Sequence, residues 1–297
     1  MTSAVEAQGL RKAFRDFTLK DVTFSLPQGY IMGLVGRNGA GKTTTIRLIL
    51  NMLARDAGAV RVLGMDTIRD EQRIKQDVGV VFDENFFVES WRVSEVERAL
   101  KGFYSRWSSK EFGRYLKDFG LPADKRLKEL SRGMKLKLML AVAMSHQARL
   151  LILDEPTSGL DPVARDELLR ILSAYISDGE RTVLFSTHIT TDLERIADFI
   201  TLLHEGAVFY TGTKDDLLES YRIVKGGPAD LTDRLREKMV GLERTSTGFS
   251  GLINASELTH LPGRILAEAP SIDDILVRIS AGNTNATENR DRDGHRE

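Results

Sequence analysis

A glycine-rich loop at residues 36–43 has the residue types and the spacing that bind phosphate. It reads Gly-Arg-Asn-Gly-Ala-Gly-Lys-Thr and matches G-x-x-x-x-G-K-[ST] at every fixed position. Glycines let the backbone curl so that successive N–H groups face a phosphate, while Lys42 can reach outer phosphate oxygens and the Thr43 hydroxyl can ligate Mg²⁺. The residues predicted to hold the nucleotide here are Gly36, Asn38, Gly39, Ala40, Gly41, Lys42, Thr43 and Thr44.

Two adjacent carboxylates follow an apolar run at residues 150–153. Asp154 and Glu155 would stand at the C-terminal end of a buried strand, where α/β sheets bind ligands. Asp154 is predicted to belong to the Mg²⁺ shell, and Glu155 to polarise the attacking water as a general base. An Asp-Glu pair at a strand end can also simply cap the following turn. Combined with the glycine-rich loop, the pair indicates hydrolysis of a nucleoside triphosphate.

A sheet is needed to bring the loop and the carboxylates together. Continuous apolar runs indicate buried strands, and apolar residues at helical spacing follow each of them. Strands that alternate with helices predict an α/β fold with a mostly parallel sheet. The strands are expected at 30–35, 150–153 and 182–185, and the helices at 42–53, 162–177 and 190–197.

Patterning along the 297 residues predicts how the chain is divided. Alternating apolar and polar residues near the N-terminus predict an antiparallel β subdomain, and residues 84–148 read as a helical insertion. The composition changes near Gly226, which predicts a small α/β accessory region. The expected divisions are a nucleotide-binding domain at 1–220, an accessory domain at 221–280 and a disordered polar tail at 281–297.

Composition restricts the classes of function. The chain has no cysteine, which excludes disulfides and thiolate metal sites. Its net charge of -1 provides no electrostatic argument for a nucleic-acid partner, and none is expected. No run approaches the roughly 18 apolar residues of a membrane span, so another chain would have to cross any membrane that this protein serves.

Three further motifs carry a resemblance to a known family. They are Leu-Ser-Arg-Gly-Met at 130–134, Ser-Gly-Leu-Asp at 158–161, and His188 after a strand. With the loop and the carboxylates in this order, residues 4–220 resemble the nucleotide-binding subunits of ATP-binding cassette (ABC) transporters, which are P-loop NTPases. The resemblance implies a substrate, ATP, and a metal cofactor, Mg²⁺.

The resemblance also implies that two subunits close head to tail over ATP. Ser131 and Gly133 of one protomer would then meet the γ-phosphate held by Lys42 of the other, and Asp161 would belong to the same shared site. His188 resembles the switch histidine, which contacts the γ-phosphate and orients water with Glu155.

Phe14 resembles the aromatic residue that stacks on adenine, and Phe17 is the competing candidate.

Two positions depart from the family pattern. Asp83 stands where the family usually has a glutamine that bridges Mg²⁺, water and the membrane subunit, so Asp83 is a candidate metal ligand through water, with Glu84 as an alternative. Arg132 replaces the usual first glycine of the signature, and Met134 the usual glutamine. Arg132 would either assist phosphate binding or hinder closure.

The function implied by the resemblance is that of an ATP-hydrolysing motor subunit. The motif variants are similar to those of single-domain bacterial ATPases that serve separately encoded ABC-2-type permeases, often exporters. Such a subunit is expected to pair with a second ATP-binding subunit, identical or different, and to lie in the cytoplasm on the inner face of the membrane through its permease. The alternatives are a soluble ABC ATPase that regulates a partner without transport, a cassette ATPase acting on nucleic acid or ribosomes, and a small-molecule kinase.

Overall fold

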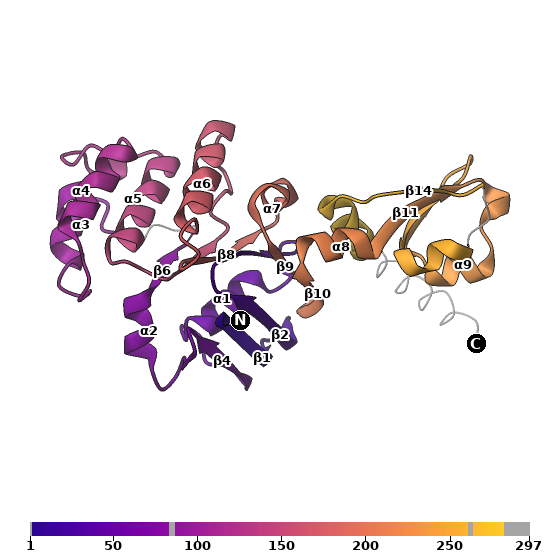
Figure 1. Ribbon diagram of the computed structural model, residues 1–297, viewed down its shortest axis with the longest axis horizontal. Helices are drawn as coiled ribbons and strands as arrows, with labels where there is room; N and C mark the ends of the chain where they lie inside the picture. Colours follow the sequence, from indigo (N-terminus) through magenta and orange to yellow (C-terminus); the bar gives the residue numbers. More distant parts are fainter. Residues whose placement is uncertain (1, 83–86, 261–263, 282–297) are drawn as a thin grey trace. The chain divides into compact units, whose positions relative to one another are not determined.

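The computed structural model describes residues 2–82, 87–260 and 264–281 (Figure 1). The chain divides into two compact units, Met1–Thr211 and Gly212–Glu297. The domain limits of 1–220 and 221–280 that the sequence suggests remain a prediction. The predicted disordered tail at 281–297 lies outside the described residues, except for Ala281.

A six-stranded sheet forms the centre of the first unit. Its strand order is β10-β9-β3-β8-β7-β6, and the pairs from β9 through to β6 are parallel. Every residue of β3, β7 and β8 is buried, which explains why these strands read as continuous apolar runs. The strands are β3 (Ile31–Val35), β6 (Val78–Val81), β7 (Leu150–Asp154), β8 (Thr182–Thr187), β9 (Phe199–His204) and β10 (Ala207–Thr213).

A second sheet of the first unit is antiparallel, has the strand order β2-β1-β4-β5, and packs against β3 and α1. Alternate residues of β2, such as Val22 and Phe24, are buried in one hydrophobic cluster with Leu34 of β3 and Ile46 of α1. One face of the sheet therefore covers the glycine-rich loop and its helix. The strands are β1 (Ser3–Ala13), β2 (Thr18–Pro27), β4 (Ala57–Val62) and β5 (Met65–Asp66).

Helices follow the strands of the central sheet, and three of them build the predicted insertion. Helices α3, α4 and α5 gather together in Figure 1 and bury their own cluster around Val96, Phe112 and Leu138. The helices of the first unit are α1 (Lys42–Ile49), α2 (Glu71–Asp77), α3 (Val93–Leu100), α4 (Ser109–Asp118), α5 (Arg132–Ser145), α6 (Pro162–Tyr175) and α7 (Thr190–Ile196).

Helix α1 is shorter than the helix expected at 42–53. It ends at Ile49, and Asn51 has a positive φ of 54°. A residue in the left-handed region terminates an α-helix, and asparagine adopts that conformation more readily than most residues. The Asn51 side chain also donates a hydrogen bond to Glu71 Oε2 at 2.8 Å, which fixes the turn against α2.

The second unit holds a four-stranded antiparallel sheet of order β12-β13-β11-β14. Val224, Phe249 and Ile253 of this sheet bury a separate core with Leu235 of α9, and residues 272–281 are helical. The elements are α8 (Lys214–Ser220), β11 (Tyr221–Gly226), α9 (Asp233–Lys238), β12 (Val240–Arg244), β13 (Phe249–Asn254) and β14 (Leu266–Glu268).

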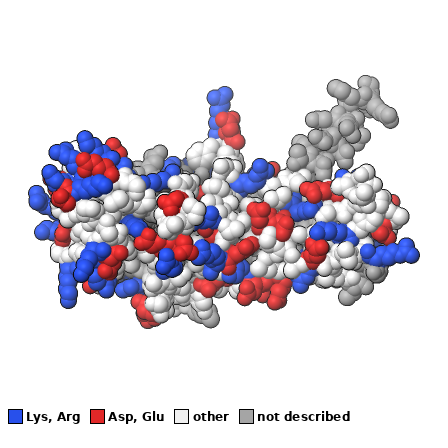
Figure 2. All heavy atoms as spheres, turned by 90° about the horizontal axis from the view of Figure 1, so that it is seen from above, with Lys and Arg blue, Asp and Glu red and all other residues white. Residues whose placement is uncertain are grey.

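Lys and Arg side chains gather over the helical insertion of the first unit (Figure 2). Two lysines of α5 pair with carboxylates: Lys135 pairs with Glu89 at 3.0 Å, and Lys137 pairs with Glu167 at 2.6 Å. These two cations therefore have acidic partners within the chain. Within the described ranges, no helix is both long enough and apolar enough to cross a membrane.

Candidate functional site

The glycine-rich loop connects β3 to α1. Gly41 is the N-cap of α1 and has a φ of 107°, a conformation that side chains rarely adopt. A Cβ at Gly41 would lie 2.8 Å from Leu19 Cδ1 and 3.0 Å from Phe17 Cζ, so glycine is needed here on steric grounds as well. Among the described residues, no side chain caps α1. The first N–H groups of this helix are therefore available to an anion.

Lys42 is buried inside the loop that it completes. Its Nζ donates to the carbonyl oxygens of Gly36 at 2.6 Å and Arg37 at 3.3 Å. The same atom lies 3.0 Å from Glu155 Oε1. Because the side chain is only 5% exposed, its charge depends on these oxygens rather than on water. The lysine thus joins the loop to the acidic end of β7.

Asp154 and Glu155 stand where the sequence predicts, at the C-terminal end of β7. The adjacent parallel strands β3, β8 and β7 all end at the same edge of the sheet, with Val35 in register with Thr187 and Asp154 with Ser186. Asp154 is buried, whereas Glu155 lies just beyond the strand with a positive φ of 50°. Strained backbone of this kind in a residue other than glycine is concentrated at functional sites.

His188 follows β8 and contacts the same carboxylate. Its Nδ1 lies 2.7 Å from Glu155 Oε2, and its backbone N–H points to that oxygen at 3.4 Å. Glu155 therefore holds Lys42 with one oxygen and His188 with the other. Lys42 stands at the start of α1, Glu155 follows β7 and His188 follows β8, and this geometry brings the three residues together as one group.

Ser186 is a member of this group that the sequence motifs do not include. Its Oγ bonds both to the Asp154 carboxylate and to the Glu155 backbone N–H. A small polar residue near the C-terminal end of a buried strand is the only sequence signal for it.

The signature residues lie on a different part of the unit. Ser131 is the N-cap of α5, and its Oγ accepts a hydrogen bond from the Met134 N–H at 3.3 Å. Asp161 is the N-cap of α6 and accepts the Val163 and Ala164 N–H groups. Within the described part of the chain, no hydrogen bond or ion pair connects Ser131, Gly133 or Asp161 to Lys42 or Glu155.

Arg132 lies over Gly159, in the turn that precedes α6. A Cβ at Gly159 would come within 2.6 Å of Arg132 Nη1, and Gly159 has a φ of 66°. A Cβ at the neighbouring Gly133 would lie 3.4 Å from Ala164 Cβ. The unusual arginine of the signature thus packs against the segment that carries Asp161.

The two candidate adenine-binding aromatics differ in their surroundings. Phe14 is 45% exposed, with its ring centroid 6.3 Å from that of Phe17. Phe17 is half-buried and packs against Gly41. Phe14 is thus the ring with a free face on the solvent side, while Phe17 supports the loop. Asp83 and Glu84, the candidates at the usual glutamine position, lie outside the described residues.

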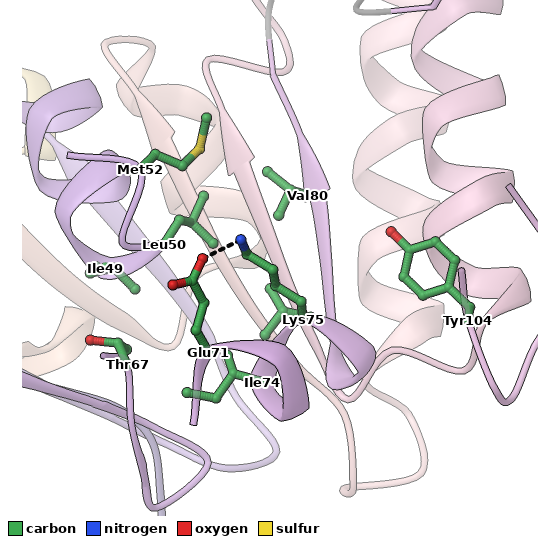
Figure 3. A pocket seen from close by; sticks show the side chains of 10 residues that line it. Ile49, Leu50, Met52, Thr67, Glu71, Ile74, Lys75, Val80 and Tyr104 are labelled. Carbon is green, nitrogen blue, oxygen red and sulfur yellow. Dashed lines mark hydrogen bonds and ion pairs between the residues drawn. The ribbon is translucent and has the colours of Figure 1, made fainter. Parts of the chain in front are cut away.

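A pocket of about 250 Å³ lies at the opposite end of α1 from the phosphate loop (Figure 3). Leu50 and Met52 line one side, Tyr104 of the insertion lies on the other, and Val80 of β6 also lines the pocket. Glu71 and Lys75 form an ion pair between them. The pocket is mainly apolar, with one ion pair in its lining.

Known proteins resemble this chain along most of its length. A family model described as ABC transporter matches residues 19–158. The Nod factor export ATP-binding protein I of Rhizobium sp. (strain N33) is 31% identical over 93% of this chain and 97% of that protein. The ABC transporter ATP-binding protein YtrB of Bacillus subtilis (strain 168) is 28% identical over 94% of this chain and 98% of its own length.

A third relative is the probable multidrug ABC transporter ATP-binding protein YbhF of Escherichia coli (strain K12). It is 34% identical over 72% of this chain and 38% of that protein. A solved structure described as an ATP binding subunit of an ABC transporter has 30% identity and a TM-score of 0.66, over 72% of this chain and 92% of that one.

Proposed function

Because this chain belongs to the ATP-binding proteins of ABC transporters, we propose that it hydrolyses ATP at a site shared with a second protomer and thereby drives a separate transmembrane permease. The chain is an ABC transporter ATPase, and the proposal concerns how its residues act. The observation that carries it is that the Glu155 carboxylate contacts both Lys42, which follows the phosphate loop, and His188, which follows β8.

The loop and α1 would bind the phosphates of ATP through backbone N–H groups. Lys42 would then exchange Glu155 Oε1, now 3.0 Å away, for phosphate oxygens. That exchange leaves the Glu155 carboxylate able to accept a proton from the attacking water, while its contact with His188 keeps it oriented. His188 is 40% exposed, so its imidazole can also reach the γ-phosphate. Phe14 would stack on adenine.

The residues at the strand ends also fit Mg²⁺. This ion binds one or two carboxylates together with substrate phosphates and water, so a site needs few protein ligands. Asp154 and the Thr43 hydroxyl supply oxygen ligands of that kind, and no cluster of three or more acidic or histidine side chains suited to a metal occurs in the described ranges. When bound, the ion would neutralise charge on the transferred phosphoryl group. Asp83 remains a further candidate ligand through water.

The separation of Ser131 and Gly133 from Lys42 supports a composite site. Ser131 opens α5 at an exposed position, where its hydroxyl and the helix N-terminus can contact a γ-phosphate of another molecule. The signature of this chain would complete the ATP site of a second subunit, identical or different. The signature of that subunit would in turn complete the ATP site of this chain. Asp161 would belong to the same shared site.

The mainly apolar pocket beside β6 is where we propose that the permease docks (Figure 3). A short permease segment with apolar side chains and one polar group would match Leu50, Met52 and Tyr104 with the Glu71–Lys75 pair. The ATPase would then lie at the membrane through that partner. Export is the direction we propose, because relatives are named for Nod factor export.

Steady-state ATPase activity as a function of protein concentration tests this function. A site shared between protomers predicts a rate that rises faster than linearly with concentration, because only dimers turn over. Lys42→Ala removes the phosphate contact, and Glu155→Gln keeps the size of the side chain but removes the base. Both variants should lose the activity. A wild-type rate equal to that of both variants at every concentration contradicts the proposal.

A further inference from the structure

The Ser186 side chain links the two acidic residues of the site. Its Oγ donates a hydrogen bond to Asp154 Oδ1 at 2.6 Å and accepts one from the Glu155 backbone N–H at 2.9 Å. Ser186 is 0% exposed and lies in register with Asp154 on the adjacent strand. We propose that Ser186 is a positioning residue for ATP hydrolysis, which holds Asp154 and Glu155 in a fixed relation. This inference rests on the proposed function of the same site.

The chemistry of the hydroxyl determines the direction of both hydrogen bonds. A serine hydroxyl carries one proton, and an ionised carboxylate can only accept. The proton therefore points to Asp154, and a lone pair on Oγ is left for the Glu155 N–H. Because the position is fully buried, water cannot replace either bond. Loss of the hydroxyl would leave two polar groups without their partner.

The bond to Glu155 holds a strained backbone. A residue other than glycine with a φ of 50° persists only where its surroundings enforce the conformation. Ser186 fixes the nitrogen of this residue, while Lys42 and His188 hold the two oxygens of its carboxylate. Without Ser186 the backbone can relax, and the carboxylate would turn away from the position where it meets the attacking water.

Ser186 lies near the end of β8, the strand that His188 follows. Only Thr187 separates them, and its Oγ1 accepts the Ile189 N–H at 2.9 Å, which shapes the turn between β8 and α7. The end of β8 therefore aligns the acidic pair and presents the histidine to it. The two hydrogen bonds of the Ser186 hydroxyl go to Asp154 and to Glu155, so it acts through these residues.

Three variants separate positioning from simple loss of stability. Ser186→Ala removes the hydroxyl, and Ser186→Cys keeps the connectivity of the side chain with a larger atom at its end, replacing a strong donor by a weak one. Thr182→Val is the matched control. Thr182 is also 0% exposed on β8, and its Oγ1 accepts the Gly29 N–H at 3.0 Å, but it lies at the other end of the strand.

The measurements are kcat and KM for ATP, the Mg²⁺ concentration giving half-maximal rate, and the melting temperature. We expect both Ser186 variants to lose about 10- to 100-fold in kcat and to need more Mg²⁺, as is common when a residue that orients a metal ligand is changed. Binding of a fluorescent ATP analogue in EDTA should change by less than about twofold, because the loop and Lys42 are intact. Thr182→Val should melt earlier but keep its kcat.

Two results would overturn the inference. One is a kcat within about threefold of wild type in either Ser186 variant that still folds. The other is an equal loss of kcat in Thr182→Val, which would assign the effect to the stability of β8. Failure of the proposed function is a distinct result, namely a wild-type rate no higher than that of Lys42→Ala.

Discussion

Glu155 connects the separate parts of the candidate site. Its backbone is held by Ser186, one carboxylate oxygen faces Lys42, and the other faces His188. Lys42 is therefore neutralised by the residue that we propose as the general base. In the proposed reaction a phosphate would replace that carboxylate, so binding of the substrate and release of the base would be linked in one exchange of partners.

Phe14 provides a prediction about nucleotide affinity. Its exposed ring has a face free for stacking, so Phe14→Ala should raise KM for ATP about tenfold, the usual cost of losing a base–aromatic stack. The value of kcat should stay near that of wild type. Phe17→Leu is the control, since Phe17 packs on Gly41 and its loss should lower the melting temperature instead. An unchanged KM in Phe14→Ala would exclude stacking by this residue.

His146 provides a prediction about pH. Burial lowers the pKa of its imidazole to about 4, and the ring stacks on Tyr104 with centroids 4.1 Å apart. As the pH falls, the imidazole of the unfolded chain is protonated near its ordinary pKa of 6.5, whereas that of the folded chain is protonated only near its pKa of about 4. The stabilising contribution is therefore complete above pH 6.5 and is lost progressively as the pH falls toward 4.

Urea unfolding at pH 7.5 and at pH 5.0 measures this loss. We expect His146 to account for about 2 kcal/mol of the destabilisation of the wild type between these pH values. His146→Phe, which can still stack on Tyr104, should be less stable than wild type at pH 7.5 but should lose correspondingly less on acidification. Equal losses in the two proteins would show that His146 is not the titrating group.

Among the elements, α5 and the turn before α6 form a connected pair. Arg132 lies over Gly159, Gly133 approaches Ala164, and Lys137 pairs with Glu167 at 2.6 Å. The segment that carries Ser131 is therefore packed on the one that carries Asp161. A movement of the helical insertion would carry both segments toward a partner together.

Gly159 tests this packing. Gly159→Ala places a methyl group against Arg132 and puts an alanine at a φ of 66°, which alanine rarely adopts. Gly179→Ala puts an alanine at a similar φ of 72°, so the backbone strain is alike in the two variants. No described atom lies within 4 Å of the Cβ position at Gly179. Because the atoms in the way are the far end of a flexible arginine side chain, Arg132 can move aside, and each alanine variant should lose about 1 kcal/mol of stability relative to wild type. Urea unfolding of wild type and the two variants measures this, and a much larger loss in Gly159→Ala than in Gly179→Ala would show that Arg132 is held in place over Gly159.

At the scale of the whole molecule, the described residues of the candidate site fall into two groups within one chain. The phosphate loop, carboxylates and histidine meet at one sheet edge, whereas the signature serine opens a helix of the insertion. The core of the second unit is separate from those of the first. We propose that residues 221–280 form an accessory domain outside the reaction itself.

A catalytically slow variant should reveal the second protomer. Glu155→Gln keeps the loop and the signature but lacks the base, so ATP and Mg²⁺ should hold it as a closed dimer. Light scattering should report twice the monomer mass of 33.2 kDa with ATP and the monomer without it. Lys42→Ala is the control that stays monomeric. A monomer of Glu155→Gln at saturating ATP would contradict the shared site.

Much of this protein could be predicted from local sequence, because the relevant physics is local. Residues 36–43 specify a phosphate loop through glycine geometry and one lysine, and continuous apolar runs identify β3, β7 and β8 because both faces of these strands are buried. The α/β class and the helical insertion follow from the same periodicities.

Tertiary structure decided which residues meet. Helix α1 stops at Ile49 because Asn51 turns toward Glu71, a contact between distant segments that helical periodicity cannot express. Likewise Ser186 joins Asp154 only because β8 lies next to β7, and Arg132 meets Gly159 only because α5 packs on the turn before α6. Residue types and spacing determine what each segment can bind. Strand order and helix packing determine which segments share a site, because these contacts join residues far apart in the chain.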